Sequence, residues 1–267
     1  MDFRVTMLFR GIVLLCVWTA SISCQAHQKW LLPNFFNAEK GPVWLSFDVT
    51  WSDTPFAAES GVGEQPLAVV RPDGRRDTPP SVFVGKTKSV AEVELTNPGT
   101  YRLEAIDPLT YWSQVDVDGK EKWLRVPKNE VREGTVKRSD LYWSKAVAFV
   151  TIGEPTDVPA ADAAEPLELT PAQHPSRLTV GDKLELRVGS YGKPVPSAEI
   201  QVFGPTATGH DPTDTIKCND QGAGSYLLPD AGRFLFSVEL EQKTPDDPKA
   251  DLKSFHVYLT VEVRGKG

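Results

Sequence analysis

Short runs of alternating apolar and polar residues dominate the chain, and hardly any stretch has apolar residues at helical spacing. Val43–Val49 alternates in this way, Leu67–Val70 ends at the turn Arg71–Gly74, and Val90–Leu95 leads into Asn97–Gly99. Because successive side chains of a strand point to opposite faces, each run predicts a strand that is closed by a turn. The pattern therefore predicts an all-β protein.

The second half of the chain repeats this order of strands and turns. Its strand-like runs are Lys183–Val188, Ala198–Phe203 and Leu228–Phe236. Gly99 and Gly232 each precede, by two residues, the aromatic residue of a late strand, Tyr101 and Phe234. A glycine followed by an aromatic residue in this position is common in immunoglobulin-like sandwiches. We therefore expect two tandem immunoglobulin-like β-sandwich domains.

The domain boundaries follow from changes in pattern. Residues 27–152 are predicted to form an N-terminal sandwich with a hairpin insertion that turns at Asp118-Gly119. The continuous apolar run Ala146–Ile152 predicts a central strand that closes this domain. Residues 153–166 are rich in Pro, Ala and acidic residues and predict a linker, and residues 167–264 predict the C-terminal sandwich.

The first 26 residues have the pattern of a secretory signal peptide. Arg4 and Arg10 precede an apolar run that is too short to span a bilayer, and Ala26 ends the segment with a small residue. We expect cleavage after Ala26, a mature chain that begins at His27, and a periplasmic or secreted protein. A lipid anchor at Cys24 is the alternative, disfavoured because the three residues before it lack leucine.

Charge and composition exclude several classes. The chain is 40% hydrophobic and 24% charged, as is usual for a globular protein. Removal of Asp2, Arg4 and Arg10 with the leader leaves 27 basic and 35 acidic residues, a net charge of 27 − 35 = −8. A chain this acidic is not expected to bind nucleic acid. No second apolar stretch of about 18 residues predicts a transmembrane helix.

Motifs for catalysis are missing from the sequence. It has no Gly-x-Ser-x-Gly elbow, no phosphate-binding loop, no His-Glu-x-x-His and no paired-cysteine metal motif. Cys218 is the one cysteine after the leader and has no neighbouring histidine, so we assign it a structural role. We expect a binding protein and not an enzyme.

Histidines are the best metal ligands that the mature chain offers, because both methionines lie in the leader. They are His27, His174, His210 and His256. An N-terminal His27 would present its α-amine and its ring Nδ1 to one metal ion. Two nitrogens in this arrangement suit Cu(II) or Ni(II). His174 is expected to be a surface residue.

A second imidazole is expected from His256. In the strand 254–263 alternate apolar residues share one face, which leaves His256 and Tyr258 on the other, open to a ligand or to a neighbouring domain. We predict His27 and His256 as metal ligands, so that the site would lie between the domains. His210 is the loop alternative, and an outward-facing His256 with no role is the simplest competing interpretation.

The start of the mature chain also carries a family resemblance. Ala26 and His27–Pro33 have the form Ala-His-x-x-Trp-Leu-x-Pro, and further matching pieces are Pro166–Pro171, Leu178–Asp182, Gly192–Ala198 and Asp230–Arg233. On these residues the chain resembles the bacterial periplasmic domain-of-unknown-function family 4198, which is grouped with periplasmic components of nickel and cobalt uptake systems. Leu32 stands where Glu is frequent in that family, which implies the loss of an oxygen ligand near the metal.

The resemblance implies a two-domain β protein that handles Ni(II) or Co(II), with Cu(II) as a third candidate, and passes it to a membrane metal transporter. One alternative is a metal-free interaction module that binds protein or polysaccharide through the tryptophans between Trp112 and Trp143. Another is an oxidative copper enzyme built on an N-terminal histidine. We disfavour it because the N-terminal domain contains no second histidine.

Overall fold

A computed structural model describes residues 27–266 of the chain, and the predicted signal peptide, residues 1–26, lies outside the described residues. Regular structure in this part of the chain is almost entirely β-strand and forms three sheets, so the predicted all-β sandwich fold is confirmed. Two short 3-10 helices complete it, η1 (Lys128–Glu130) and η2 (Pro175–Arg177). Among residues 27–266, no helix is long and apolar enough to cross a membrane.

The first sheet belongs to the N-terminal half and has the order β1-β3-β8-β7, with β4 paired to β3. Its five strands are β1 (Gln28–Pro33), β3 (Val43–Ser52), β4 (Ser60–Gly61), β7 (Ser81–Val84) and β8 (Ser89–Leu95).

The third sheet belongs to the C-terminal half and has the order β12-β13-β14, with β17 paired to β13. Its four strands are β12 (Glu168–Pro171), β13 (Lys183–Ser190), β14 (Lys193–Pro194) and β17 (Ala223–Leu227).

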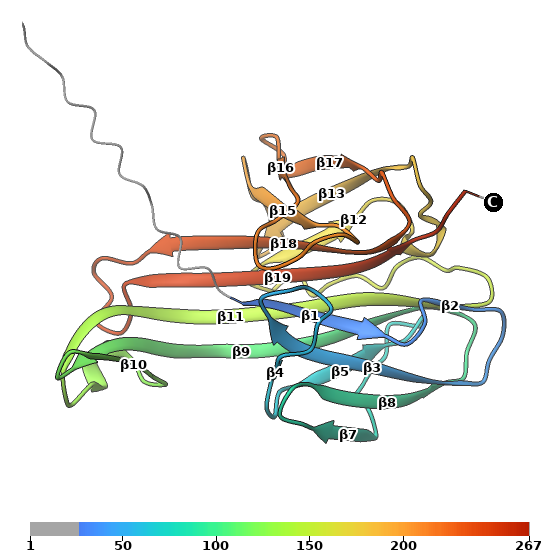
Figure 1. The fold of residues 1–267 in the computed structure, drawn as a ribbon. Coiled ribbons are helices and arrows are strands. Elements are labelled where there is room, and N and C mark those ends of the chain that lie inside the picture. The colour runs from blue at the N-terminus through green and yellow to red at the C-terminus, as the bar shows by residue number, and fades with distance from the viewer. Residues whose placement is uncertain (1–26, 267) are drawn as a thin grey trace, which may run out of the picture.

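Between them lies a ten-stranded sheet to which both halves contribute, with the order β16-β15-β18-β19-β11-β9-β5-β6 and with β10 on β9 and β2 on β11. Its strands are β2 (Asn37–Ala38), β5 (Leu67–Val70), β6 (Arg76–Asp77), β9 (Gly99–Val117), β10 (Lys120–Leu124), β11 (Thr135–Ile152), β15 (Glu199–Phe203), β16 (Asp214–Lys217), β18 (Gly232–Lys243) and β19 (Leu252–Val263). The other two sheets lie on opposite sides of its long strands (Figure 1).

The two halves join where β11 pairs with β19 in parallel, from Asp140 opposite Leu252 to Ala148 opposite Thr260. The apolar run Ala146–Ile152 is therefore central, as its sequence predicts, and both of its faces are covered. Even-numbered residues such as Ala148 face the first sheet, and odd-numbered residues such as Val147 face the third. The predicted tandem sandwiches thus share one sheet.

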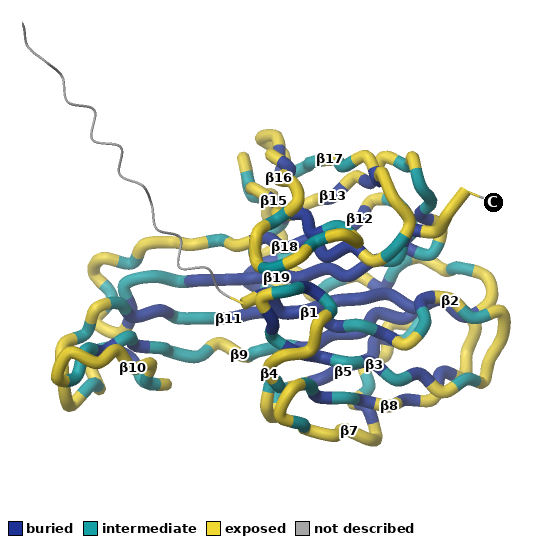
Figure 2. Tube along the Cα trace, viewed as in Figure 1, coloured by how far each residue is buried: buried dark blue, intermediate teal, exposed yellow. Residues whose placement is uncertain are grey.

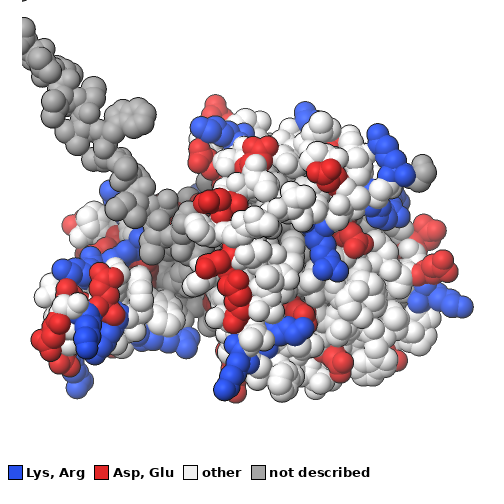
Figure 3. Space-filling view, viewed as in Figure 1, with Lys and Arg blue, Asp and Glu red and all other residues white. Residues whose placement is uncertain are grey.

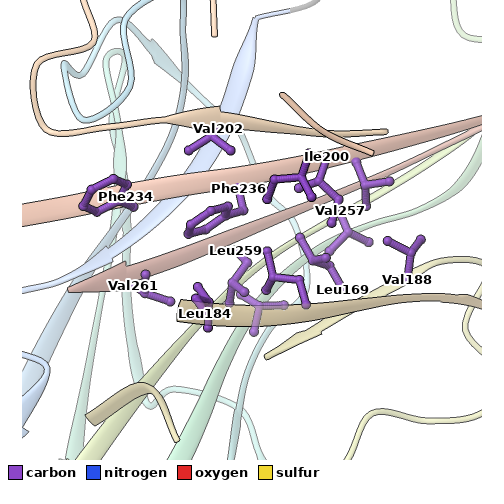
Figure 4. Close-up of a cluster of buried hydrophobic side chains, with 14 of the residues drawn as sticks. Leu169, Leu184, Val188, Ile200, Val202, Phe234, Phe236, Val257, Leu259 and Val261 are labelled. Carbon is purple, nitrogen blue, oxygen red and sulfur yellow. The ribbon is translucent and has the colours of Figure 1, made fainter. Parts of the chain in front are cut away.

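Each side of the shared sheet has its own apolar core. The core toward the third sheet is packed with leucine, valine, isoleucine and phenylalanine side chains from β12, β13, β15, β18 and β19 (Figure 4). The buried strands that form these cores run along the middle of the molecule (Figure 2). In the other core the Tyr101 hydroxyl donates to Asn97 O at 2.7 Å, the tyrosine corner that is typical of immunoglobulin-like sandwiches.

The predicted linker packs against the shared sheet through buried charges. Lys145 of β11 has a fully buried side chain that forms ion pairs with Glu165 at the end of the linker and with Glu168 of β12. Arg102 of β9 is also buried and lies 2.8 Å from both Glu168 and Glu104. Burial raises the pKa of Glu165 to about 7, against the charge of Lys145, which favours the ionised form.

The hairpin turn at Asp118-Gly119 is confirmed between β9 and β10. Asp118 and Gly119 have φ angles of 52° and 75°, in the left-handed region that the two central residues of such a turn require. The hairpin is the tip of an extension in which β9, β11, β18 and β19 run beyond the other two sheets (Figure 1). We call this extension the arm, and it comprises residues 108–142 and 241–254.

The face of β19 that carries His256 is covered by the N-terminal half. The sequence predicts that either a ligand or a neighbouring domain lies against this face, and the structure shows the neighbouring domain. The Tyr258 ring packs edge-on against Trp51 of β3, with 6.0 Å between ring centroids. His256 is 7% exposed, its ring lies 5.2 Å from that of Tyr142, and its Nε2 is 2.8 Å from Ser254 Oγ. Burial and the charge of Arg138 lower the pKa of His256 to about 4.

Replacement of Lys145 tests the buried charges. Lys145→Met should lower the free energy of unfolding by about 3–5 kcal/mol, because Glu165 and Glu168 stay buried without this cation. The measurement is urea denaturation at pH 8. The control is Lys137→Met, whose half-exposed side chain lies 3.8 Å from Asp116. It should cost less than about 1 kcal/mol, and equal losses in both variants would contradict the assignment.

Acid sensitivity tests the burial of His256. Its pKa is lower in the folded than in the unfolded state, so the unfolded chain takes up the proton first and stability falls as the pH drops from about 6.5 to 4. The loss attributable to His256 is on the order of 3 kcal/mol. The urea midpoint should therefore fall less between pH 7 and pH 4 in His256→Phe than in the wild type. Identical shifts in both proteins would mean that the pKa of His256 is the same in the folded and the unfolded state.

Candidate metal centre

His27 lies at the start of the described chain, one residue before β1, and the sheet register determines what it meets. Gln28 pairs with Ser52 in the antiparallel β1–β3 ladder, so the next position brings His27 opposite Asp53. The His27 Nδ1 atom is 2.7 Å from Asp53 Oδ1. Both side chains are exposed, by 64% and 53%, so this ion pair contributes little to the stability of the fold.

Glu59 completes a group of three acidic or imidazole side chains. Its Oε2 accepts a hydrogen bond of 2.9 Å from the backbone N–H of Asp53. The Glu59 carboxylate therefore lies next to Asp53, at the other end of the loop 53–59. One ligand atom from each of His27, Asp53 and Glu59 lies within 4.8 Å of the others. Across residues 27–266 this is the one group of three or more His, Cys, Asp or Glu side chains that meets that distance. Acidic side chains gather beside the start of β1 (Figure 3).

Trp30 and Ser52 hold the acidic loop in place. The buried Trp30 donates its indole N–H to Ser52 Oγ at 2.8 Å, and that hydroxyl donates to Thr54 O at 2.7 Å. Phe56 packs its ring 5.7 Å from the ring of Trp30 and has a φ of 66°, an uncommon value for a bulky residue. The tryptophan three residues after His27 thus positions the loop that carries the carboxylates.

The spacing of the three groups suits a transition-metal ion. Two donor atoms at adjacent positions around one ion, each about 2.1 Å from it, lie about 3 Å apart. The Nδ1–Oδ1 distance of 2.7 Å needs little adjustment to reach that arrangement. A set of one imidazole and two carboxylates is a mixed nitrogen and oxygen site, of the kind that suits Ni(II), Co(II), Zn(II) or Cu(II) and not Cu(I).

The other histidines lie elsewhere. His174 is a structural residue, because its Nε2 is 2.9 Å from Thr100 Oγ1 and 3.0 Å from Thr156 O. His210 is in an exposed loop, 3.6 Å from Asp211. His256 and His210 both line a cavity of about 670 Å³ together with Gln28, the residue after His27. The predicted pairing of His27 with His256 on one metal stays a prediction.

Sequence reasoning misses Asp53 and Glu59. Neither residue stands in a recognisable motif, and the β1–β3 pairing that brings Asp53 to His27 cannot be deduced from one sequence. The resemblance also suggests an oxygen ligand at position 32. Leu32 lies five residues along β1 from His27, about 17 Å in an extended strand, so a side chain there cannot share a metal with His27. Cys218 is buried in the apolar core, in line with a structural role, and burial raises the pKa of its thiol.

Comparison with solved structures gives matches of low similarity. The D0-D1 domain of intimin is 11% identical over 87% of this chain and 97% of its own, with a TM-score of 0.22. The human OSCAR ligand-binding domain is 11% identical over 86% and 97% of the two chains, with a TM-score of 0.20. A DUF3823 family protein from Bacteroides uniformis is 8% identical over 88% and 100%, with a TM-score of 0.24.

TM-scores this low give no information about the function of this chain. Comparison with the curated proteins gives no match. A comparison with family models matches residues 24–242 to one described as a domain of unknown function, DUF4198. That match includes the His27–Pro33 segment and every strand from β1 to β17, and the chain belongs to the DUF4198 family.

Proposed function

We propose that this protein binds a divalent transition-metal ion outside the cytoplasm, through His27, Asp53 and Glu59. The observation that supports the proposal is the convergence of one ligand atom from each of these three side chains within 4.8 Å. His27 directly precedes β1 and Asp53 directly follows β3, so the pairing of Gln28 with Ser52 fixes the backbone next to both residues. Its role is binding, and no catalytic step is proposed.

Processing after Ala26 would add a fourth donor to this set. The α-amine of a terminal His27 and its Nδ1 can chelate one ion, while Asp53 Oδ1, 2.7 Å from Nδ1, supplies an adjacent oxygen. Four donors from two nitrogens and two carboxylates neutralise the charge of a divalent ion. Nitrogen donors suit Co(II), Ni(II) and Cu(II), which lie late in the first transition series. Ni(II) and Co(II) are the proposed ions and Cu(II) is the third candidate.

The exposure of the site fits delivery of the ion more than permanent storage. His27 is 64% and Asp53 is 53% exposed, so a second protein can reach the bound ion directly. We propose that the protein works in the periplasm or outside the cell and passes its metal to a membrane transporter. A structural metal site, in contrast, is closed by protein ligands on all sides.

The free N-terminus is the first test of this proposal. The chain that begins at His27 should bind Ni(II), Co(II) or Cu(II) at least tenfold more tightly than the same chain extended by one N-terminal residue, because the extension removes the amine from the chelate. The measurement is calorimetric titration of both proteins at pH 7.5. Equal affinities would exclude the amine as a ligand.

The carboxylates are tested separately. Asp53→Asn and Glu59→Gln should each weaken metal binding by about tenfold or more, since each replaces an anionic ligand by a neutral one, and His27→Ala should abolish tight binding. The matched control is His210→Ala, which removes an exposed imidazole that lies outside the group of three. If His210→Ala weakened binding as much as His27→Ala, the metal would have to lie in the neighbouring cavity.

A further inference from the structure

One face of the arm is left open by the rest of the described chain. On the opposite face, Ser113 Oγ donates to Val126 O at 2.8 Å and Ser139 Oγ donates to Lys249 O at 3.1 Å. The segments 125–131 and 244–251 therefore cover that side. On the open face the first sheet ends at β1, so side chains of β9, β10, β11, β18 and β19 beyond β1 lie without a covering sheet (Figure 1).

Rings follow a diagonal line across four neighbouring strands of this open face. The ladder pairs Trp123 of β10 with Gln114 of β9, two residues from Trp112, and pairs Trp112 with Asp140 of β11, two residues from Tyr142. Because residues two apart share a face, the two tryptophans lie on the same side as Tyr142.

His256 and Tyr258 of β19 continue the same line to where the first sheet covers it, since Tyr258 packs against Trp51 of β3. The ring of His256 lies 5.2 Å from that of Tyr142 and 6.3 Å from that of Tyr258, nearly parallel to the latter at 10°. Trp123 is 47% exposed, Trp112 and Tyr142 are partly exposed, and His256 and Tyr258 are buried. We call these five residues, Trp123, Trp112, Tyr142, His256 and Tyr258, the ring stripe.

Planar polar side chains lie beside the ring stripe and are held in position by one another. Arg138 donates through its Nε to both oxygens of Asp140 at 2.8 and 2.9 Å, and through Nη2 to Glu241 Oε1 at 2.6 Å. The amide of Gln114 donates to Glu121 at 3.1 Å. Asp140 lies opposite Trp112 in the ladder, and Glu121 is two residues from Trp123 on β10, so carboxylates and rings share this face.

The ring stripe leads into the cavity of about 670 Å³ on the same side of the central sheet. His256 and Tyr258 line this cavity, together with Glu199, Glu239, Glu241 and His210. A cavity of this size accommodates a ligand of drug-like size. Burial and the charge of Glu241 raise the pKa of Glu239 to about 7, so this carboxyl can donate as well as accept a hydrogen bond near neutral pH.

We propose that the ring stripe and its cavity bind a neutral oligosaccharide. The apolar faces of sugar rings stack on aromatic side chains, and sugar hydroxyls donate to carboxylates and accept from amide and guanidinium N–H groups. The open face supplies both kinds of contact along a line that crosses several strands. A single closed pocket would instead fit one small molecule.

The charge of the open face determines the kind of sugar. Glu199, Glu239 and Glu241 line the cavity, no Lys or Arg among residues 27–266 lines it, and the guanidinium of the nearby Arg138 is already paired with Asp140 and Glu241. A uronate, sulfated or nucleic-acid chain would be repelled by these carboxylates. The proposal is independent of the metal site, because none of the ring-stripe residues belongs to the group of His27, Asp53 and Glu59.

Affinity electrophoresis in gels that contain soluble β-glucan, mannan, xylan or alginate tests the proposal. At least one of the three neutral polysaccharides should retard the full mature chain, and alginate should not. Trp112→Ala and Trp123→Ala should each raise the dissociation constant at least tenfold. The matched control is Trp44→Ala, which removes a tryptophan that is 59% exposed on β3, outside the arm, and it should leave retardation unchanged.

Three outcomes would overturn the proposal: no retardation by any neutral polysaccharide, retardation by alginate alone, or equal losses in Trp44→Ala and Trp112→Ala. A variant that fails to fold is recognised from its near-ultraviolet circular dichroism. In that case Glu241→Gln provides the second test, because it keeps a hydrogen-bonding side chain but removes a charge from the half-exposed carboxylate that pairs with Arg138. It should change the dissociation constant by at least threefold.

Discussion

The parallel pairing of β11 with β19 is the constraint on which the rest of the structure depends. It joins the last strand of the N-terminal half to the last strand of the C-terminal half, so two sandwiches are built on the two faces of one sheet. Parallel strands need both faces covered, and here the first sheet covers one and the third sheet covers the other. The same pairing brings Tyr142 of one half next to His256 of the other.

Local sequence pattern predicts the individual strands and not their partners. The period of two correctly divides β19 into an apolar face and a face with His256 and Tyr258, and the apolar run in β11 correctly predicts a central strand. The turn at Asp118-Gly119 is likewise local. That β11 pairs with β19 depends on a contact between residues far apart in the chain, which no short-range pattern specifies.

In the candidate metal centre, too, the sequence identifies one residue but not the residues that the fold places beside it. His27 is identified by its position in the sequence, but its neighbours Asp53 and Glu59 follow from the register of β1 on β3 and from the loop that Trp30 and Ser52 hold. The exposed pair of His27 and Asp53 adds little to folding, whereas the buried Lys145 and Arg102 organise the interior. The charges that serve the fold and those that serve the proposed metal site are therefore different residues.

A shared sheet also limits how such a protein can change in evolution. Sandwich domains that are connected only by a linker can be duplicated, lost or exchanged as independent units. Here, loss of either half would expose the edge of β11 or β19 that pairs from Asp140 to Ala148, with apolar side chains on both of its faces. An uncovered edge of that kind promotes association between chains. The two halves of this family member are thus constrained to be inherited together.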